Sequence, residues 1–234
     1  MSYTTPAVEP GHRSDSVISK VLNILVTPGD VFDQVIAMRF RQSTWILPTL
    51  LVCLTGLFLV VVGKTPEQTS AAGGGLVEAS SSISASQAET LIRHWTPISL
   101  VLVCVVPLIG TFWSATIVWA MGRFLLRARF RFSQALAVVA LTGTILALGS
   151  LVTGLLVLAA GNGAVRPGLS VFLPRLSPEN SIVLATGVFN IFNLWSTAVL
   201  GIGLSRLAKV SLKEALFWVF GWWFILRLGL ILLA

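Results

Sequence analysis

Residues 133–160 read SQALAVVALTGTILALGSLVTGLLVLAA and contain no charged side chain. A helix needs about 20 consecutive apolar residues to cross about 30 Å of bilayer hydrocarbon. Because lipid offers no hydrogen-bond partners, the backbone of such a run must pair its own N–H and C=O groups as a helix. A transmembrane β-strand would alternate apolar and polar residues, and this run does not. The stretch therefore predicts a membrane-spanning α-helix.

The composition of the whole chain is also that of a membrane protein. Of its 234 residues, 55% are hydrophobic and 11% are charged, whereas about 25% of residues are charged in soluble domains. The net charge is +7. Since the basic residues stand beside apolar runs, we expect anionic lipid headgroups as partners rather than nucleic acid. The first forty or so residues lack the apolar core of a cleavable signal peptide, so the first span is expected to direct insertion.

Four further runs are long and apolar enough to span the bilayer, so we predict an all-α, polytopic membrane helix bundle with five transmembrane helices. The predicted spans are residues 45–62, 97–121, 133–160, 182–208 and 211–234. Together they form a membrane domain over residues 45–234, which follows an N-terminal segment over residues 1–44.

The distribution of lysine and arginine predicts the orientation of these spans. Eleven of these residues lie in the N-terminal segment and around the second and fourth connections, and four lie in the first and third connections. Loops that carry an excess of Lys and Arg stay in the cytoplasm. We therefore expect a cytoplasmic N-terminus and an external C-terminus.

Two short amphipathic helices are predicted in the N-terminal segment, within residues 17–40. The first has an apolar face at Ile18, Val21, Leu22 and Leu25, and the second has one at Phe32, Val35 and Ile36. The sequence TPGD at residues 27–30 is typical of a helix start, with a capping Thr, a Pro in the first turn and an early acid. Two arrangements remain open: the helices lie on the inner leaflet, or they pack on the cytoplasmic ends of the bundle.

Several short motifs are similar to those of a known family. They are PGDVFDQVI at residues 28–36, WILP at 45–48, FSQAL at 132–136, NLWS at 193–196 and AKVS at 208–211. Over residues 20–230 the chain resembles bacterial proteins of the Yip-domain (Ypt/Rab-interacting protein) family, which implies five spans. Eukaryotic members bind Rab GTPases, but their Asp-Leu-x-Gly-Pro motif is absent here. The resemblance thus implies an architecture, residence in a bacterial inner membrane, and a non-enzymatic membrane scaffold or adaptor.

The inventory of reactive side chains predicts no catalytic, cofactor or metal site. His12 and His94 are predicted on opposite sides of the membrane, so a histidine cluster is not expected. No Asp or Glu lies in the interior of a predicted span. We therefore expect neither a catalytic carboxylate pair nor an intramembrane carboxylate proton relay. No P-loop or G-x-S-x-G motif is present. Cys53 and Cys104 are interpreted as small packing residues.

One charge lies inside a predicted span, Arg227 in the fifth. An arginine in the bilayer needs polar partners or water. The fourth span offers Asn190 at a matching depth and Asn193 one turn deeper, and these three residues form the candidate intramembrane polar site. Its role is either structural hydrogen bonding between helices or a water-lined, anion or headgroup site. The second reading corresponds to a small transporter, channel or lipid-handling subunit.

Basic residues beside the spans are the other candidate contacts. They are Arg123, Arg127, Arg129 and Arg131 between the second and third spans, with Arg39 and Arg41 before the first. Positive-inside topology explains most of them. The remaining roles are binding of anionic headgroups and docking of a membrane or cytosolic protein partner. Stripes of small residues on the third and fourth spans, such as Gly143, Gly154 and Gly201, predict either tight helix packing or a groove.

Overall fold

The computed structural model describes residues 17–37, 42–62, 85–160 and 190–233. Within these ranges the chain forms seven α-helices and one π-helical turn, and no strand. The elements are α1 (Val17–Asn23), α2 (Pro28–Ala37), α3 (Ser43–Val62), α5 (Ala85–Ala120), η1 (Met121–Leu125), α6 (Phe132–Ala160), α8 (Ile191–Ala208) and α9 (Leu212–Leu233). The prediction of an all-α fold is confirmed for this part of the chain.

Four of the described helical stretches are long and apolar enough to cross a membrane. They are Ser43–Val62, Val101–Leu125, Phe132–Ala159 and Ile191–Ala208. α9 has 22 residues but is not among the four. The chain is therefore a helical membrane protein with four such stretches, and a fifth span remains a prediction.

The predicted limits of the spans differ most at the second and fourth. α5 begins at Ala85, twelve residues before the predicted span, and continues into η1. α8 begins only at Ile191, because Asn190 has extended backbone angles (φ −84°, ψ 137°). A continuous helix from residue 182 to 208 is therefore wrong. The Asn190 side-chain oxygen accepts a hydrogen bond from the Phe192 N–H and so caps the start of α8. A hydropathy profile cannot detect such a capping bond.

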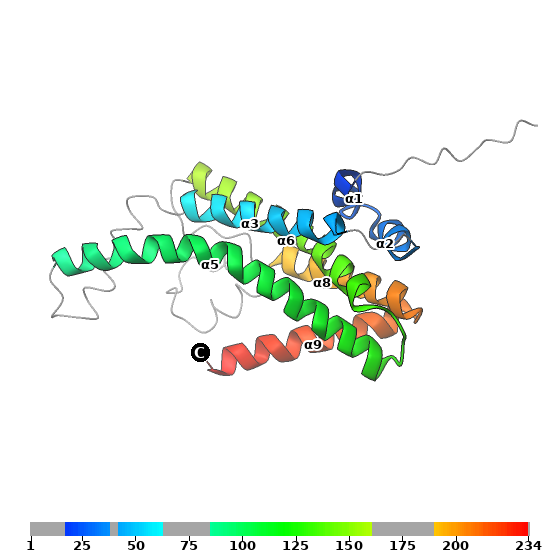
Figure 1. Ribbon diagram of the computed structural model, residues 1–234. Helices are drawn as coiled ribbons and strands as arrows, with labels where there is room; N and C mark the ends of the chain where they lie inside the picture. The colour runs from blue at the N-terminus through cyan, green and yellow to red at the C-terminus, as the bar shows by residue number, and fades with distance from the viewer. Residues whose placement is uncertain (1–16, 38–41, 63–84, 161–189, 234) are drawn as a thin grey trace, which may run out of the picture.

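α6 is the central helix of the bundle and packs against α3, α5 and α8, while α9 packs against α8 (Figure 1). Glycines permit the closest approaches. A Cβ atom at Gly154 would overlap the ring of Phe58 on α3, and one at Gly201 would lie 2.5 Å from Leu216 on α9. At these positions the small-residue stripes serve helix packing, which is the first of the two roles predicted for them.

α1 and α2 pack on one end of the bundle. Phe32 is fully buried, and α2 contacts α6 and α8 while α1 contacts α3. The predicted apolar face of α2 is thus confirmed. The predicted face of α1 is confirmed only in part: Val21 is buried and Leu25 packs partly buried against the core, whereas Ile18 and Leu22 are exposed and Ile24 is buried. The helix ends at Asn23, so Leu25 does not continue its helical register.

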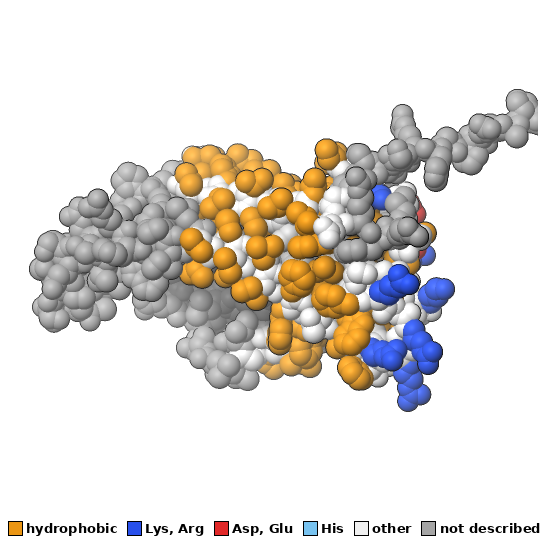
Figure 2. All heavy atoms as spheres, viewed as in Figure 1, with side chains coloured by type: hydrophobic (Ala, Val, Ile, Leu, Met, Phe, Trp, Pro, Cys, Tyr) orange, Lys and Arg blue, Asp and Glu red, His pale blue; other side chains and the backbone are white. Residues whose placement is uncertain are grey.

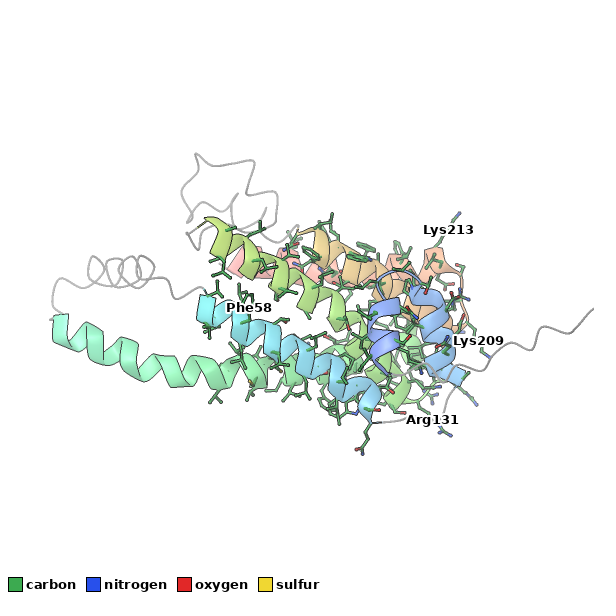
Figure 3. All side chains as sticks on the ribbon, turned by 90° about the horizontal axis from the view of Figure 1, so that it is seen from above. Phe58, Arg131, Lys209 and Lys213 are labelled. Carbon is green, nitrogen blue, oxygen red and sulfur yellow. The ribbon has the colours of Figure 1, made fainter. Side chains whose placement is uncertain are left out.

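The basic side chains gather at this same end. In Figure 2 the described lysines and arginines lie beyond a wide band of exposed hydrophobic side chains. Arg131, Lys209 and Lys213 lie at this end, and Phe58 lies toward the other (Figure 3). The α5–α6 turn, the α8–α9 turn and the N-terminal helices therefore form a single basic end of the molecule.

Candidate functional site at the basic end

The turn between α5 and α6 has a defined backbone. The N–H of Leu126 donates to the carbonyl of Met121 at 3.1 Å, which closes the π turn. Arg127 follows with φ 52°, a left-handed conformation that ends the helix. A Cβ atom at Gly122 would overlap the Phe130 ring, so only glycine lets this ring fold back onto the helix.

This turn presents the four arginines that the sequence singled out. Arg123, Arg127, Arg129 and Arg131 are all exposed. At physiological ionic strength, like charges on exposed side chains repel each other only weakly. The fold therefore tolerates the four arginines on one turn. Arg39 and Arg41 lie outside the described residues. The structure thus brings four of the six predicted basic contacts to one surface.

Gln134 joins this turn to the N-terminal helices. Its Oε1 accepts a hydrogen bond from the backbone N–H of Arg131 at 3.0 Å, as the third residue of a helix does in a capping box. Its Nε2 donates to the carbonyl of Ile36 in α2 at 3.4 Å. One side chain therefore caps α6 and holds the end of α2.

Asp33 and Arg206 make a second link between α2 and the bundle. Arg206 Nη1 lies 3.4 Å from Asp33 Oδ2, and the two side chains are 50% and 52% exposed. Such a half-exposed pair stabilises a fold by at most about 1 kcal/mol. A Cβ atom at Gly29 would lie 3.2 Å from Arg206 Nη2, so the first turn of α2 also closes over the guanidinium.

A cavity of about 540 Å³ lies beside this pair, between α2 and the α8–α9 turn. Asp33, Ser205, Arg206 and Lys209 contribute its polar lining. Lys209 is the C-cap of α8, with φ 55° and its N–H bonded to the carbonyl of Ser205. Two cations against one carboxylate give the cavity a positive balance, which suits an anion. No cluster of three metal-ligating side chains occurs among the described residues.

A second cavity, of about 360 Å³, lies at mid-bundle among α3, α5, α6 and α8. Its described lining is apolar apart from hydroxyls such as Ser114 and Thr197, and it includes no charged side chain. The Thr111 hydroxyl donates to the carbonyl of Pro107 at 2.8 Å. A third cavity of about 170 Å³, between α5, α8 and α9, shares Ser114, Thr197 and Leu200 with it.

The predicted intramembrane polar site is only partly within the described structure. Asn190 caps α8, and its Oδ1 accepts from the Phe192 N–H at 2.9 Å. The carbonyl of Asn193 accepts from Thr197 Oγ1 at 2.7 Å. The side chain of Arg227 lies outside the described residues. Measured along the helices from Lys209, Asn190 lies at ~28 Å and Arg227 at ~27 Å, at 1.5 Å per residue, so their heights match and their pairing remains a prediction.

Sequence reasoning missed two associations at these sites. It used Arg206 and Lys209 only to orient the spans, although their spacing at the end of α8 indicated a shared face. It could not pair them with Asp33, because no local pattern links α2 to α8. It also treated the cysteines separately, whereas Cys53 Sγ lies 3.5 Å from the carbonyl oxygen of Cys104.

A comparison with family models agrees with the helical membrane architecture. The model of the Yip1 domain matches residues 22–233, which includes α2, the bundle and the last two residues of α1. No curated protein and no solved structure matches the chain. A match over nearly the whole chain establishes the family. The chain belongs to the Yip1-domain family of membrane proteins.

Proposed function

We propose that this protein is a non-enzymatic membrane scaffold or adaptor that binds its partners at the basic end. The observation that carries the proposal is the packing of α1 and α2 on the ends of α3, α6 and α8. Because of this packing, the N-terminal helices, the arginine-rich turn and the α8–α9 turn make one folded surface outside the apolar band (Figure 2). A folded surface of this kind suits specific docking.

The proposed topology has five spans, with α9 as the fifth. The basic end faces the cytoplasm of a bacterium with an inner membrane, and the C-terminus faces outside. The excess of Lys and Arg at this end supports the orientation. At ~1.5 Å per residue, the 22 residues of α9 reach about 33 Å, enough to cross the hydrocarbon.

The surface offers a partner both apolar and basic contacts. Ile18 and Leu22 lie one helical turn apart on α1 and are each 62% exposed. Arg127 and Arg129 are exposed on the α5–α6 turn at the same end. A protein segment with apolar and acidic side chains complements this combination, because charge complementarity adds specificity to apolar contact.

Photo-crosslinking in native membranes tests the adaptor proposal. A photoreactive residue at position 22 is expected to capture a defined partner protein, and the capture is expected to fail after Arg127→Glu with Arg129→Glu. Lys213→Glu, which reverses an exposed charge at the same end but off the turn, is the matched control. Capture of the same proteins by all three chains would contradict the proposal.

A second candidate function is that of a small transporter or lipid-handling subunit with a polar site near Arg227. The adjoining hydroxyl-lined cavities at mid-bundle favour it, as does the matched height of Asn190 and Arg227. Arg227→Leu is then expected to reduce solute flux or lipid exchange in proteoliposomes. Arg227→Lys is expected to restore it only in part, because Lys lacks the planar set of donors. Equal flux for all three chains would favour the adaptor.

A further inference from the structure

We infer that the cavity between α2 and the α8–α9 turn binds the phosphate of an anionic phospholipid headgroup, with Arg206 and Lys209 as its ligands. Asp33 acts there as an internal competitor for Arg206. The inference concerns lipid rather than protein, so it does not depend on the adaptor function and is testable on the isolated chain.

The contact between Arg206 and Asp33 leaves the guanidinium free to bind a second anion. A guanidinium has five N–H donors. The single 3.4 Å contact to Asp33 is longer than the 2.7–2.9 Å typical of a charge-assisted hydrogen bond. Half of the Arg206 side chain remains exposed. The guanidinium is thus held near the cavity without being saturated by its carboxylate partner.

Lys209 adds a second positive charge to the lining of the same cavity. Lys209 ends α8 with a left-handed backbone, and it lines the cavity together with the first residue of α9, Leu212. The Ser205 hydroxyl already donates to the carbonyl of Ile202 at 2.9 Å, so the two cations are the principal ligands.

The remaining lining indicates a lipid as the source of the phosphate. Ile36, Ile202, Val210 and Leu212 give the cavity an apolar side. The basic end that contains it borders the exposed hydrophobic band (Figure 2), where the headgroup region of a bilayer would lie. A free phosphate ion gains nothing from apolar contacts, whereas the acyl-chain methylene groups next to a phospholipid headgroup do.

Asp33 is placed to compete with such a headgroup. Its neighbour Phe32 is buried against α6 and α8, which fixes the helix that carries the Asp33 carboxylate beside Arg206. A phosphate that takes Arg206 must displace this carboxylate. Removing the negative charge is therefore expected to strengthen lipid binding, whereas removing the two cations is expected to weaken it.

Native mass spectrometry of the purified full chain tests the inference. Delipidated protein in detergent is titrated with phosphatidylglycerol or with phosphatidylcholine, and the bound lipid is counted. Arg206→Gln with Lys209→Gln is expected to weaken phosphatidylglycerol binding about 25-fold, at about fivefold per basic residue. Lys213→Gln removes an exposed lysine at the same end that does not line the cavity, and it is expected to leave binding unchanged.

Two further arms separate this site from nonspecific attraction and from a free ion. Asp33→Asn is expected to bind phosphatidylglycerol a few-fold more tightly, a gain that a misfolded variant does not produce. Millimolar inorganic phosphate is expected to compete poorly. Equal losses in the double variant and in Lys213→Gln, or no gain with Asp33→Asn, would overturn the inference. Full displacement of the lipid by inorganic phosphate would overturn the lipid source.

Discussion

Gly203 is a point at which three helices of the bundle meet. A Cβ atom there would overlap Cγ1 of Val138 on α6 and would lie 3.2 Å from the ring of Phe32 on α2. Close helix contact in a membrane depends on such small residues, because lipid leaves little hydrophobic drive between helices. Gly203 therefore allows both the close approach of α6 to α8 and the packing of α2 against α8.

Replacing Gly203 is expected to destabilise the protein. Gly203→Ala forces a methyl group into Val138, and overpacking of this kind costs about 1–3 kcal/mol. The midpoint of an SDS-unfolding titration measures the change. Gly221→Ala is the control, because a Cβ atom at Gly221 meets nothing within 4 Å, and its midpoint is expected to stay near that of the wild type. Equal shifts for the two variants would contradict the role given to Gly203.

Truncating Phe32 is expected to release α2 from the bundle. The side chain is 0% exposed, and Phe→Ala in a core costs about 3–5 kcal/mol, more than the contacts of a ten-residue helix are expected to withstand. Hydrogen exchange of the α2 amides is expected to accelerate while exchange in α6 stays slow. The control is Ile18→Ala on exposed α1 surface. Unchanged exchange in α2 would show that the helix is held by Gln134 and Arg206 instead.

α3 and α5 lie against each other through contacts that sequence alone did not pair. The rings of Trp45 and Phe112 meet edge to face, with centroids 5.3 Å apart. Cys53 Sγ donates toward the carbonyl of Cys104 at 3.5 Å. Residues 45–62 of α3 and 101–112 of α5 contain no charged side chain, so the facing sides of these stretches carry no clear polar–apolar period.

Oxidation tests this pair of helices. Iodine is expected to join Cys53 and Cys104 in a disulfide within one chain, because the Cys53 sulfur already reaches the backbone of Cys104. An intramolecular disulfide removes the maleimide-reactive thiols while the protein still migrates as a monomer. Cys104→Ser is expected to keep Cys53 reactive under the same treatment. Quantitative thiol labelling of the oxidised wild type would show that α3 and α5 do not pack this way.

The sequence predicted the elements better than their contacts. Hydropathy located α3, α6 and α9 to within two residues, because length and lack of charge decide whether a helix spans. It misplaced the start of α8, where the Asn190 cap decides. The basic residues of the candidate site were visible in the sequence, but their arrangement was not. The partners of Arg206, Gln134 and Gly203 lie on α2 and α6, and only the packed bundle brings them together.

At the scale of the whole molecule, the described basic side chains share one end of the bundle. The described basic side chains gather at the end that carries α1 and α2 (Figures 2 and 3). The energetic cost of moving such a cluster across a bilayer opposes inversion of the finished protein. The orientation is therefore expected to be uniform in the population.

Cysteine labelling in intact cells tests this orientation. In a chain with Cys53 and Cys104 replaced by Ser, a cysteine introduced at Ala128 is expected to be protected from a membrane-impermeant maleimide. A cysteine at Ser81, in the first predicted outer connection, is expected to react. Permeabilising the cells is expected to expose the first site as well. Equal labelling at both positions in sealed cells would contradict the proposed topology.

The docking of α2 also has a consequence for biosynthesis. Phe32 packs beside Gly203, which a ribosome adds about 170 residues later, or roughly ten to thirty seconds at 5–20 residues per second. During that interval Val31 and Phe32 have no α8 to cover them, so they are open to chaperones at the ribosome exit. α2 is therefore expected to dock only after α8 has been made.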